Sequence, residues 1–177
     1  MKFQFNLIIF IICVLCLTSC IQNPSKKEIA IVIQASNQEQ KLIEIDKLIN
    51  KYPKSYITYE NRLNILLALK DIDNSIINVQ LGMLYILNNN NENADNQFKT
   101  AVILYNKQLI ECNNNKNKKR LISMELYIPL CMLNKKEEAA SLISEYLGNL
   151  SLTEKYLIGL LNSENRLDIA DIFCLTE

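Results

Sequence analysis

Thiols and carboxylates are the side chains of this sequence that could take part in covalent or acid-base chemistry, because its 177 residues include no histidine. Without histidine, the chain lacks the usual general base and the commonest metal ligand. Three of the six cysteines lie in the first twenty residues, and the others, Cys112, Cys131 and Cys174, lack the spacing of a zinc site. Glu137 and Glu138 are adjacent, so on a helix they point in different directions. These features predict a protein that is not an enzyme and holds no metal or soluble cofactor.

The first twenty residues have the organisation of an export signal. Lys2 is followed by eleven uncharged apolar residues at positions 7–17. Such a run is typical of a signal-peptide core, whereas a membrane-spanning helix needs about twenty apolar residues. The run ends in Leu17-Thr18-Ser19-Cys20, where a thiol follows two small residues. An uncleaved anchor, or an ordinary secretory signal with a chance cysteine, is the alternative interpretation.

The tetrad ending in Cys20 resembles the lipobox of bacterial lipoproteins at all four positions. The resemblance implies that the thiol receives a diacylglyceryl group and that the chain is cleaved before it, so that residues 1–19 are a signal peptide. The mature protein would then be held in a membrane of the cell envelope by two or three acyl chains, palmitate among them. Ile21 stands where an aspartate would resemble an inner-membrane retention signal, which favours the outer membrane. Residues 20–35 are predicted to be a lipidated terminus and tether.

Composition indicates a single helical domain over residues 36–177. Glycine and proline number three each, which favours long helices, and 49% of the residues are apolar. The 19 basic residues balance the 19 acidic ones, so nothing in the net charge would attract nucleic acid. A short basic run at residues 116–120 could touch phosphate, but it is more typical of a solvated loop. Cys112, Cys131 and Cys174 are expected to be buried core residues.

Apolar residues recur at intervals of three and four, which is the pattern of amphipathic helices. Asn-rich stretches at 88–96 and 113–118 are predicted to be loops, and Pro129 is expected to kink or break its helix. Ser151 and Glu154 form the sequence pattern of a capping box. The predicted helices cover residues 42–52, 55–69, 72–86, 98–112, 119–133, 136–147, 152–161 and 165–174.

Two segments resemble tetratricopeptide repeats, which are helical hairpins of about 34 residues. Pro53 matches the proline that closes a repeat, and small residues match where two helices approach closely. Leu63, Tyr127 and Tyr146 depart from the family pattern. The resemblance implies an all-α fold of stacked antiparallel hairpins, and an irregular helical bundle is the alternative. The first unit matches at Tyr59, Leu66, Lys70-Asp71, Ser75, Val79 and Gly82, and the second, from Arg120, at Leu126, Leu130, Ala139 and Ile143.

The resemblances together imply a lipid-anchored adaptor that faces the periplasm and binds a protein or peptide of the envelope. In tetratricopeptide proteins the first helices line a binding groove. The alternative for the apolar members of that groove is that they belong to the core. Two other functions stay open: a surface-exposed lipoprotein that binds a host, toxin or neighbouring-cell ligand, and an enzyme with two converging acids in a pocket. The groove positions that carry over are Glu60, Asn64, Leu67, Met124, Ile128 and Cys131.

Overall fold

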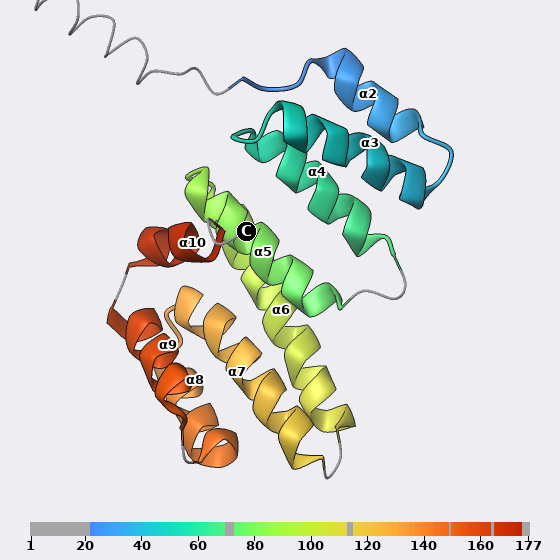
Figure 1. The fold of residues 1–177 in the computed structure, drawn as a ribbon. Helices are drawn as coiled ribbons and strands as arrows, with labels where there is room; N and C mark the ends of the chain where they lie inside the picture. The colour runs from blue at the N-terminus through green and yellow to red at the C-terminus, as the bar shows by residue number, and fades with distance from the viewer. Residues whose placement is uncertain (1–21, 70–72, 113–114, 149, 164, 175–177) are drawn as a thin grey trace, which may run out of the picture. The chain divides into compact units, whose positions relative to one another are not determined.

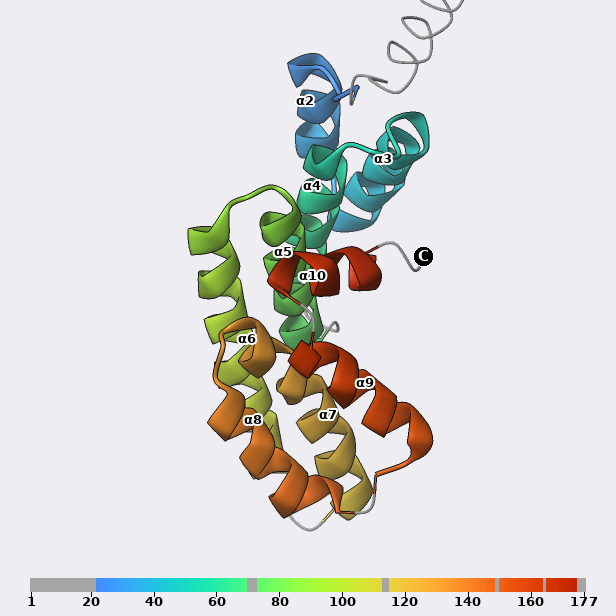
Figure 2. The same ribbon diagram turned by 90° about the vertical axis from the view of Figure 1, so that its left-hand side faces the viewer.

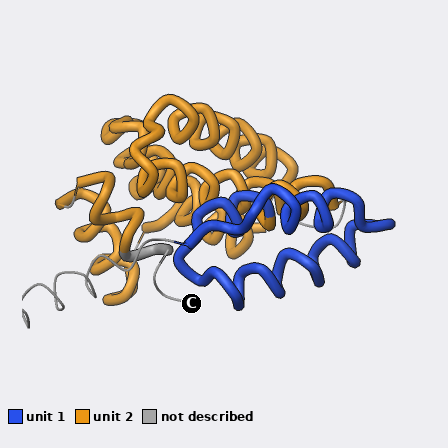
Figure 3. The backbone as a smooth tube through the Cα atoms, turned by 90° about the horizontal axis from the view of Figure 1, so that it is seen from above, with its two compact units in different colours: residues 1–61 blue, residues 62–177 orange. Residues whose placement is uncertain are grey.

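The computed structural model describes residues 22–69, 73–112, 115–148, 150–163 and 165–174, and in these ranges the chain is helical without a strand (Figure 1). The all-α prediction is therefore confirmed. The leader, Cys20 and the predicted turn at Lys70-Asp71 lie outside the described residues. The chain divides into two compact units, residues 1–61 and 62–177 (Figure 3), and a single domain over residues 36–177 stays a prediction. Helix α4, Tyr56–Leu67, runs across the boundary.

Unit 1 is built on a hairpin of α2, Lys26–Gln34, and α3, Gln38–Lys51. Val32 and Ile45 are 2% and 0% exposed, because each helix buries one apolar position against its neighbours. Ser25 and Glu28 form a capping box at the start of α2, and Asn37 caps α3. The prediction that residues 20–35 are a tether is therefore wrong for 26–34. The polar residue directly before α2, Ser25, is its cap, and the apolar residues of the helix are consecutive, at 29–33, so they show no helical periodicity.

Glu28 joins the two helices of the hairpin. Its carboxylate accepts hydrogen bonds from the Ser25 backbone N–H, the Lys51 Nζ and the Tyr52 hydroxyl, at 2.8, 2.8 and 3.0 Å. These donors, Lys51 first, lower the pKa of Glu28 to about 2. Ser55, which is buried, donates from its hydroxyl to Asn23 Oδ1 at 2.7 Å. The first turn of α2 is thus attached to the end of α3.

Unit 2 holds the larger core. Helix α5 packs beside α6, α6 beside α7, and α10 across α5, while α7 also contacts α8, η1 and α9 (Figures 1 and 2). Leu63 of α4 and Leu81 of α5 belong to a second, smaller cluster. Residues predicted as one helix at 136–147 form an α-helix followed by a π-helix. The elements are α5 Asn74–Leu87, α6 Asn91–Glu111, α7 Lys116–Met132, α8 Lys136–Leu142, the π-helix η1 Ile143–Leu147, α9 Leu152–Ser163 and α10 Arg166–Cys174.

The asparagine-rich stretch at 88–96 is not the predicted loop, because α6 begins at Asn91 and Ala94 is fully buried. Asn89 has a positive φ of 58° and ends α5: its N–H donates to the Ile86 carbonyl, and the Asn90 N–H donates to the Tyr85 carbonyl. Asn90 then caps α6 with its side chain. Asparagine accepts the left-handed conformation and also caps N-termini, so consecutive asparagines connect two helices directly.

Two further predictions concern α7. The second asparagine-rich stretch, 113–118, is not a loop at its end, because α7 begins at Lys116 with Asn115 as its cap. Of the kink or break expected at Pro129, the break is absent, since α7 continues to Met132 with the proline buried inside it, and the kink stays a prediction. Packing against the neighbouring helices offsets the loss of one backbone hydrogen bond. The Leu133 N–H still donates to the Pro129 carbonyl at 3.0 Å.

Several pairs of adjacent helices pack together, among them α5 with α6 and α6 with α7, but the close approach expected within the first repeat occurs between a different pair. Gly82 of α5, matched to a small position of the first repeat, faces the Phe98 ring of α6 rather than α4. The predicted hairpin of α7 and α8 is present. Asn134 ends α7 with a φ of 59°, and the Lys135 N–H donates to the Leu130 carbonyl at 2.9 Å. The same turn chemistry therefore ends α5 and α7.

Candidate protein-binding surface

The α4 side of the predicted groove is only partly accessible. Asn64 is exposed, and Glu60, one turn earlier on the same helix, is half-buried. Leu67 is also half-buried, because it packs against the smaller cluster that contains Leu81. The polar residues are therefore the ones that this half of the groove offers to a partner.

The α7 side of the predicted groove belongs mainly to the core of unit 2. Met124 and Ile128 are half-buried against that core, and Cys131 lies inside it at 8% exposure. Burial is the main reason that the pKa of the Cys131 thiol is raised. Its Sγ is 4.0 Å from the Asn162 side-chain oxygen, to which the Tyr127 hydroxyl donates at 3.1 Å. Cys131 is thus a core residue, which corrects its assignment to a groove.

The apolar groove positions pack into two different clusters, Leu67 into the smaller one of α4 and α5, and the α7 positions into the larger one, which runs from α5 to α10. A shared apolar groove requires that these side chains be exposed together, and they are not. Cys112 is also buried and free, as expected for a core cysteine. The described chain offers other apolar side chains to solvent instead.

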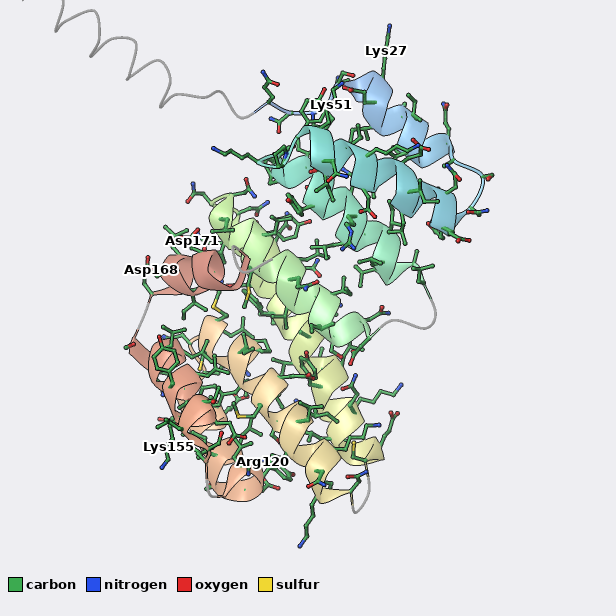
Figure 4. All side chains as sticks on the ribbon, viewed as in Figure 1. Lys27, Lys51, Arg120, Lys155, Asp168 and Asp171 are labelled. Carbon is green, nitrogen blue, oxygen red and sulfur yellow. The ribbon has the colours of Figure 1, made fainter. Side chains whose placement is uncertain are left out.

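Helix α9 carries a stripe of exposed apolar side chains that the sequence analysis missed. Leu152 is 86% exposed and Tyr156, one turn later, is 73% exposed. Lys155 extends away from the helix beside them (Figure 4). The opposite side of α9 packs through Ile158 and Leu161, which are 8% and 3% exposed. The spacing of four residues between Leu152 and Tyr156 was a visible signal, but core stripes show the same spacing.

An ion pair between α7 and α9 positions this stripe. The Arg120 guanidinium donates to both oxygens of Glu154, at 3.1 Å from Nε and 2.6 Å from Nη2, and its Nη1 donates to the Leu147 carbonyl. Glu154 also accepts from the Ser151 N–H at 2.7 Å, and the Glu154 N–H donates to the Ser151 hydroxyl at 3.2 Å. The predicted capping box is confirmed. Arg120 is therefore committed to an ion pair within unit 2 and is not part of a free basic run.

We expect the Arg120–Glu154 pair to lose its stabilising effect in acid. Arg120 first, and then the Ser151 backbone, lower the pKa of Glu154 from 4.5 to about 2. A carboxyl group whose pKa is lower in the folded state stabilises the fold when the pH is above its unfolded-state pKa. This stabilisation disappears as the pH falls toward the folded-state pKa. Arg120→Met should therefore lower the thermal midpoint at pH 7, and its difference from the unsubstituted protein should shrink between pH 4.5 and about pH 2 to the part that comes from the Arg120 hydrogen bond to the Leu147 carbonyl.

Thermal unfolding followed by circular dichroism across this pH range measures the effect. Glu28 titrates similarly in both proteins, so its contribution cancels in the difference. Lys135→Met is the matched control, because it removes an ion pair to Glu138 in which both side chains are largely exposed. An Arg120→Met difference that stays constant from pH 7 to pH 2 would show that the arginine stabilises the fold through packing and its bond to the Leu147 carbonyl, and not through the Glu154 carboxylate.

The carboxylates of Asp73, at the start of α5, and Glu125, on α7, lie near enough to influence each other. Burial, and then the charge of Asp73, raise the pKa of Glu125, and burial is the main cause of the raised pKa of Tyr105. Gln108 Nε2 donates to both Asp73 oxygens, at 3.0 and 3.1 Å, and Asp73 Oδ1 caps α5 by accepting from the Ser75 N–H at 2.8 Å. Asp73 is therefore committed to holding the start of α5, which makes this a structural cluster.

Other features of the described residues bear on function. A shallow hollow at the α7–α8 turn is lined by solvent-exposed side chains, including the paired Lys135 and Glu138 and the adjacent Glu137. Within the described ranges no three potential metal ligands gather at one place. Among the helices of these ranges, none combines the length and the hydropathy that crossing a bilayer requires. Comparison of the chain with protein-family models, curated proteins and solved structures finds no match.

Proposed function

We propose that the protein is a membrane-anchored lipoprotein that acts as a non-enzymatic protein-binding adaptor in the bacterial cell envelope, at the outer membrane and facing the periplasm. The observation that carries this proposal is Cys20 in its context, a thiol preceded by Leu17-Thr18-Ser19 and an eleven-residue apolar run. A diacylglyceryl thioether on that thiol would attach the chain stably, because two acyl chains together bind a bilayer far more tightly than one.

The α9 stripe supports the binding half of the proposal. Leucine and tyrosine side chains that are largely exposed on a rigid helix are suited to fill pockets of a partner, and tyrosine is enriched at the energetic centres of interfaces. The Arg120–Glu154 pair holds the helix in place, so binding would not require the stripe to be ordered first. A protein or peptide with a complementary apolar surface fits this chemistry, and Asn64 on α4 offers a separate polar position.

Photo-crosslinking in intact cells tests the adaptor proposal. A photoreactive residue at position 156 is expected to capture one dominant envelope protein, whereas the same residue at Lys99, an exposed site on α6, should capture little. Position 64 tests the groove that the repeat resemblance implies. Capture should fall when Leu152→Ser is added, since that change removes the neighbouring apolar contact without altering the core.

The outcomes separate the competing interpretations. Equal capture from positions 156 and 99 would contradict an α9 binding surface, and capture from position 64 alone would move the site to α4. Protease treatment of intact cells distinguishes a periplasmic adaptor, which is protected, from a lipoprotein on the outer surface, which is cleaved.

A further inference from the structure

Helix α9 carries exposed positions at intervals of four, three and four along one line. They are two large residues followed by two small ones, Leu152, Tyr156, Gly159 and Ser163. This spacing keeps all four within an arc roughly 60° wide on one side of the helix. Helix α9 lies at the edge of unit 2 in both views of the ribbon (Figures 1 and 2). These four residues, the α9 seam, therefore form one uncovered side that is bulky in its first half and nearly flat in its second.

The flat half of the α9 seam can receive a large side chain. An added Cβ at Gly159 meets nothing within 4 Å, so the space above it is open. Ser163 donates its hydroxyl to the Leu160 carbonyl at 3.3 Å, so covering it leaves no hydroxyl donor unpaired. The carboxylate of α9, Glu154, is turned toward Arg120 and paired with it. No acidic group of the helix therefore opposes an apolar residue placed on this half.

The order of large and small residues matches its own reverse. When two copies of α9 run antiparallel about an axis at the level between residues 157 and 158, Tyr156 lies opposite the partner's Gly159. In the same register Leu152 lies opposite the partner's Ser163. Each copy then places its two large residues over the two small positions of the other, as a two-fold contact requires. Parallel copies would set tyrosine against tyrosine and leave a gap at the glycine, so the antiparallel register is favoured.

We infer that a second copy of this chain is the partner that binds the α9 seam, in an antiparallel two-fold pair. The inference rests on the proposed function, which assigns protein binding to α9, and it names the partner. Paired copies present the other exposed positions twice, Asn64 among them. An adaptor of this kind is bivalent toward a further envelope protein, which raises its avidity without any new contact.

The area of the α9 seam suits a weak pair. Leu152 and Tyr156 are 86% and 73% exposed, and together they offer roughly 300 Å², since a large aromatic side chain alone buries about 150–250 Å². Two copies contribute roughly 600 Å² from these side chains and cover the small positions as well, which is less than the about 1,200 Å² at which stable interfaces begin. The pair therefore dissociates in dilute solution and forms where two anchored copies are confined to one membrane.

Cysteines placed across the α9 seam test the register in cells. Two differently tagged full-length copies are made together, one with Leu152→Cys and the other with Ser163→Cys, and the membranes are mildly oxidised. A disulfide needs Cα atoms within about 7 Å of each other, which the antiparallel register gives to this mixed pair. Two copies of Leu152→Cys have their cysteines roughly 16 Å apart along the helix axis in that register, so this variant alone should give at least about tenfold less dimer.

The natural cysteines set the background of this measurement. Cys112 and Cys131 are buried, and copies without an added cysteine, oxidised in the same way, report what the natural thiols contribute. Equal yields from the mixed copies and from Leu152→Cys alone would refute the antiparallel register, and a mixed yield no higher than the background would refute the pair.

Further substitutions make the result specific to the α9 seam. Gly159→Lys places a charge under the partner's tyrosine, and Tyr156→Ser removes the largest side chain. Both positions are exposed in the single chain, so neither change disturbs the core. Each should lower the mixed disulfide yield by about tenfold, as loss of a central contact does. Ile110→Ser is the matched control, because it removes an isoleucine that is 80% exposed on α6 and should leave the yield unchanged. A yield that survives Gly159→Lys would overturn the inference.

The inference and the proposed function fail separately. A photoreactive residue at position 156 that captures a different protein would uphold binding by α9 and refute a second copy as its partner. The mass of the protein purified from cells reports whether Cys20 carries a lipid, and an unmodified thiol would refute the anchor whatever the disulfide yields are. Absence of the mixed disulfide refutes the pair and leaves the lipid anchor and the adaptor role standing.

Discussion

Replacing Cys20 by alanine is expected to abolish incorporation of labelled palmitate into the protein and to leave the precursor uncleaved. Alanine is as small as the neighbouring Ser19, so the leader keeps its apolar character, but it has no thiol to form a thioether. The loss should be complete, because one side chain is the sole attachment point in the proposal. Metabolic labelling and mass spectrometry of the purified chain measure both the lipid and the position of cleavage.

Cys16→Ala is the matched control for Cys20→Ala. Cys16 lies inside the same apolar run, four residues before Cys20. Its replacement should leave labelling and cleavage unchanged, since it retains the tetrad 17–20. Labelled palmitate that remains on the Cys20→Ala protein would refute the lipobox interpretation and would point to another acylated residue.

Replacing Gly82 by valine is expected to destabilise unit 2 by about 3 kcal/mol, the upper part of the range for overpacked cores. A Cβ atom at this position would lie 2.6 Å from the nearest atom of the Phe98 ring, which is closer than nonbonded carbons come. The ring is fully buried, and the Arg166 guanidinium lies over it, 5.9 Å from its centroid, while binding Asp95 at 2.6 Å. The ring is therefore enclosed, and α5 must move away from α6.

Gly159→Ala is expected to have the opposite effect. Gly159 is exposed on α9, and an added Cβ there meets nothing within 4 Å. Alanine favours a helix over glycine by about 0.8–1 kcal/mol, so the variant should be more stable than the unsubstituted protein. Urea unfolding followed by hydrogen exchange on peptides of α6 and α7 reports the stability of unit 2 for both variants.

A second change at position 98 tests the cause of the Gly82 effect. Phe98→Leu removes ring atoms and is destabilising by itself. In the double variant Gly82→Val with Phe98→Leu, however, the total loss of unfolding free energy should be smaller than the sum of the losses in the two single variants. Strict additivity would show that the valine disturbs α5 for a reason other than the ring. A Gly82→Val protein as stable as the unsubstituted one would contradict the close approach of α5 and α6.

The Asn-rich connection between α5 and α6 shows why local composition misled the prediction at 88–96. Asparagine is common in loops because it adopts turn conformations and competes for backbone hydrogen bonds. The same properties allow Asn89 to end one helix and Asn90 to begin the next. The residues after them stay helical because Ala94 and Phe98 are buried against unit 2. Burial of one face outweighs the modest helix propensity of asparagine.

Features that depend on local interactions were predictable from the amino-acid sequence alone. The helical class and most helix positions follow from apolar residues spaced three and four apart, and the Ser151–Glu154 box follows from two residues three positions apart. These features involve neighbours within one or two turns, so they need no knowledge of the fold. The Leu17-Thr18-Ser19-Cys20 tetrad is likewise a local pattern, and its lipid remains a prediction.

Which apolar stripes are core and which are surface depends on contacts that form in the folded chain. Leu152 with Tyr156, and Ile158 with Leu161, have similar helical spacing on α9, yet the first pair faces solvent and the second faces α7. Helical periodicity shows that residues share a face, but the direction of that face depends on contacts with residues distant in the chain. Arg120 binds Glu154, which is 34 positions away in the sequence. Packing of α7 against its neighbouring helices likewise buries Cys131 in the core, where it cannot line a groove.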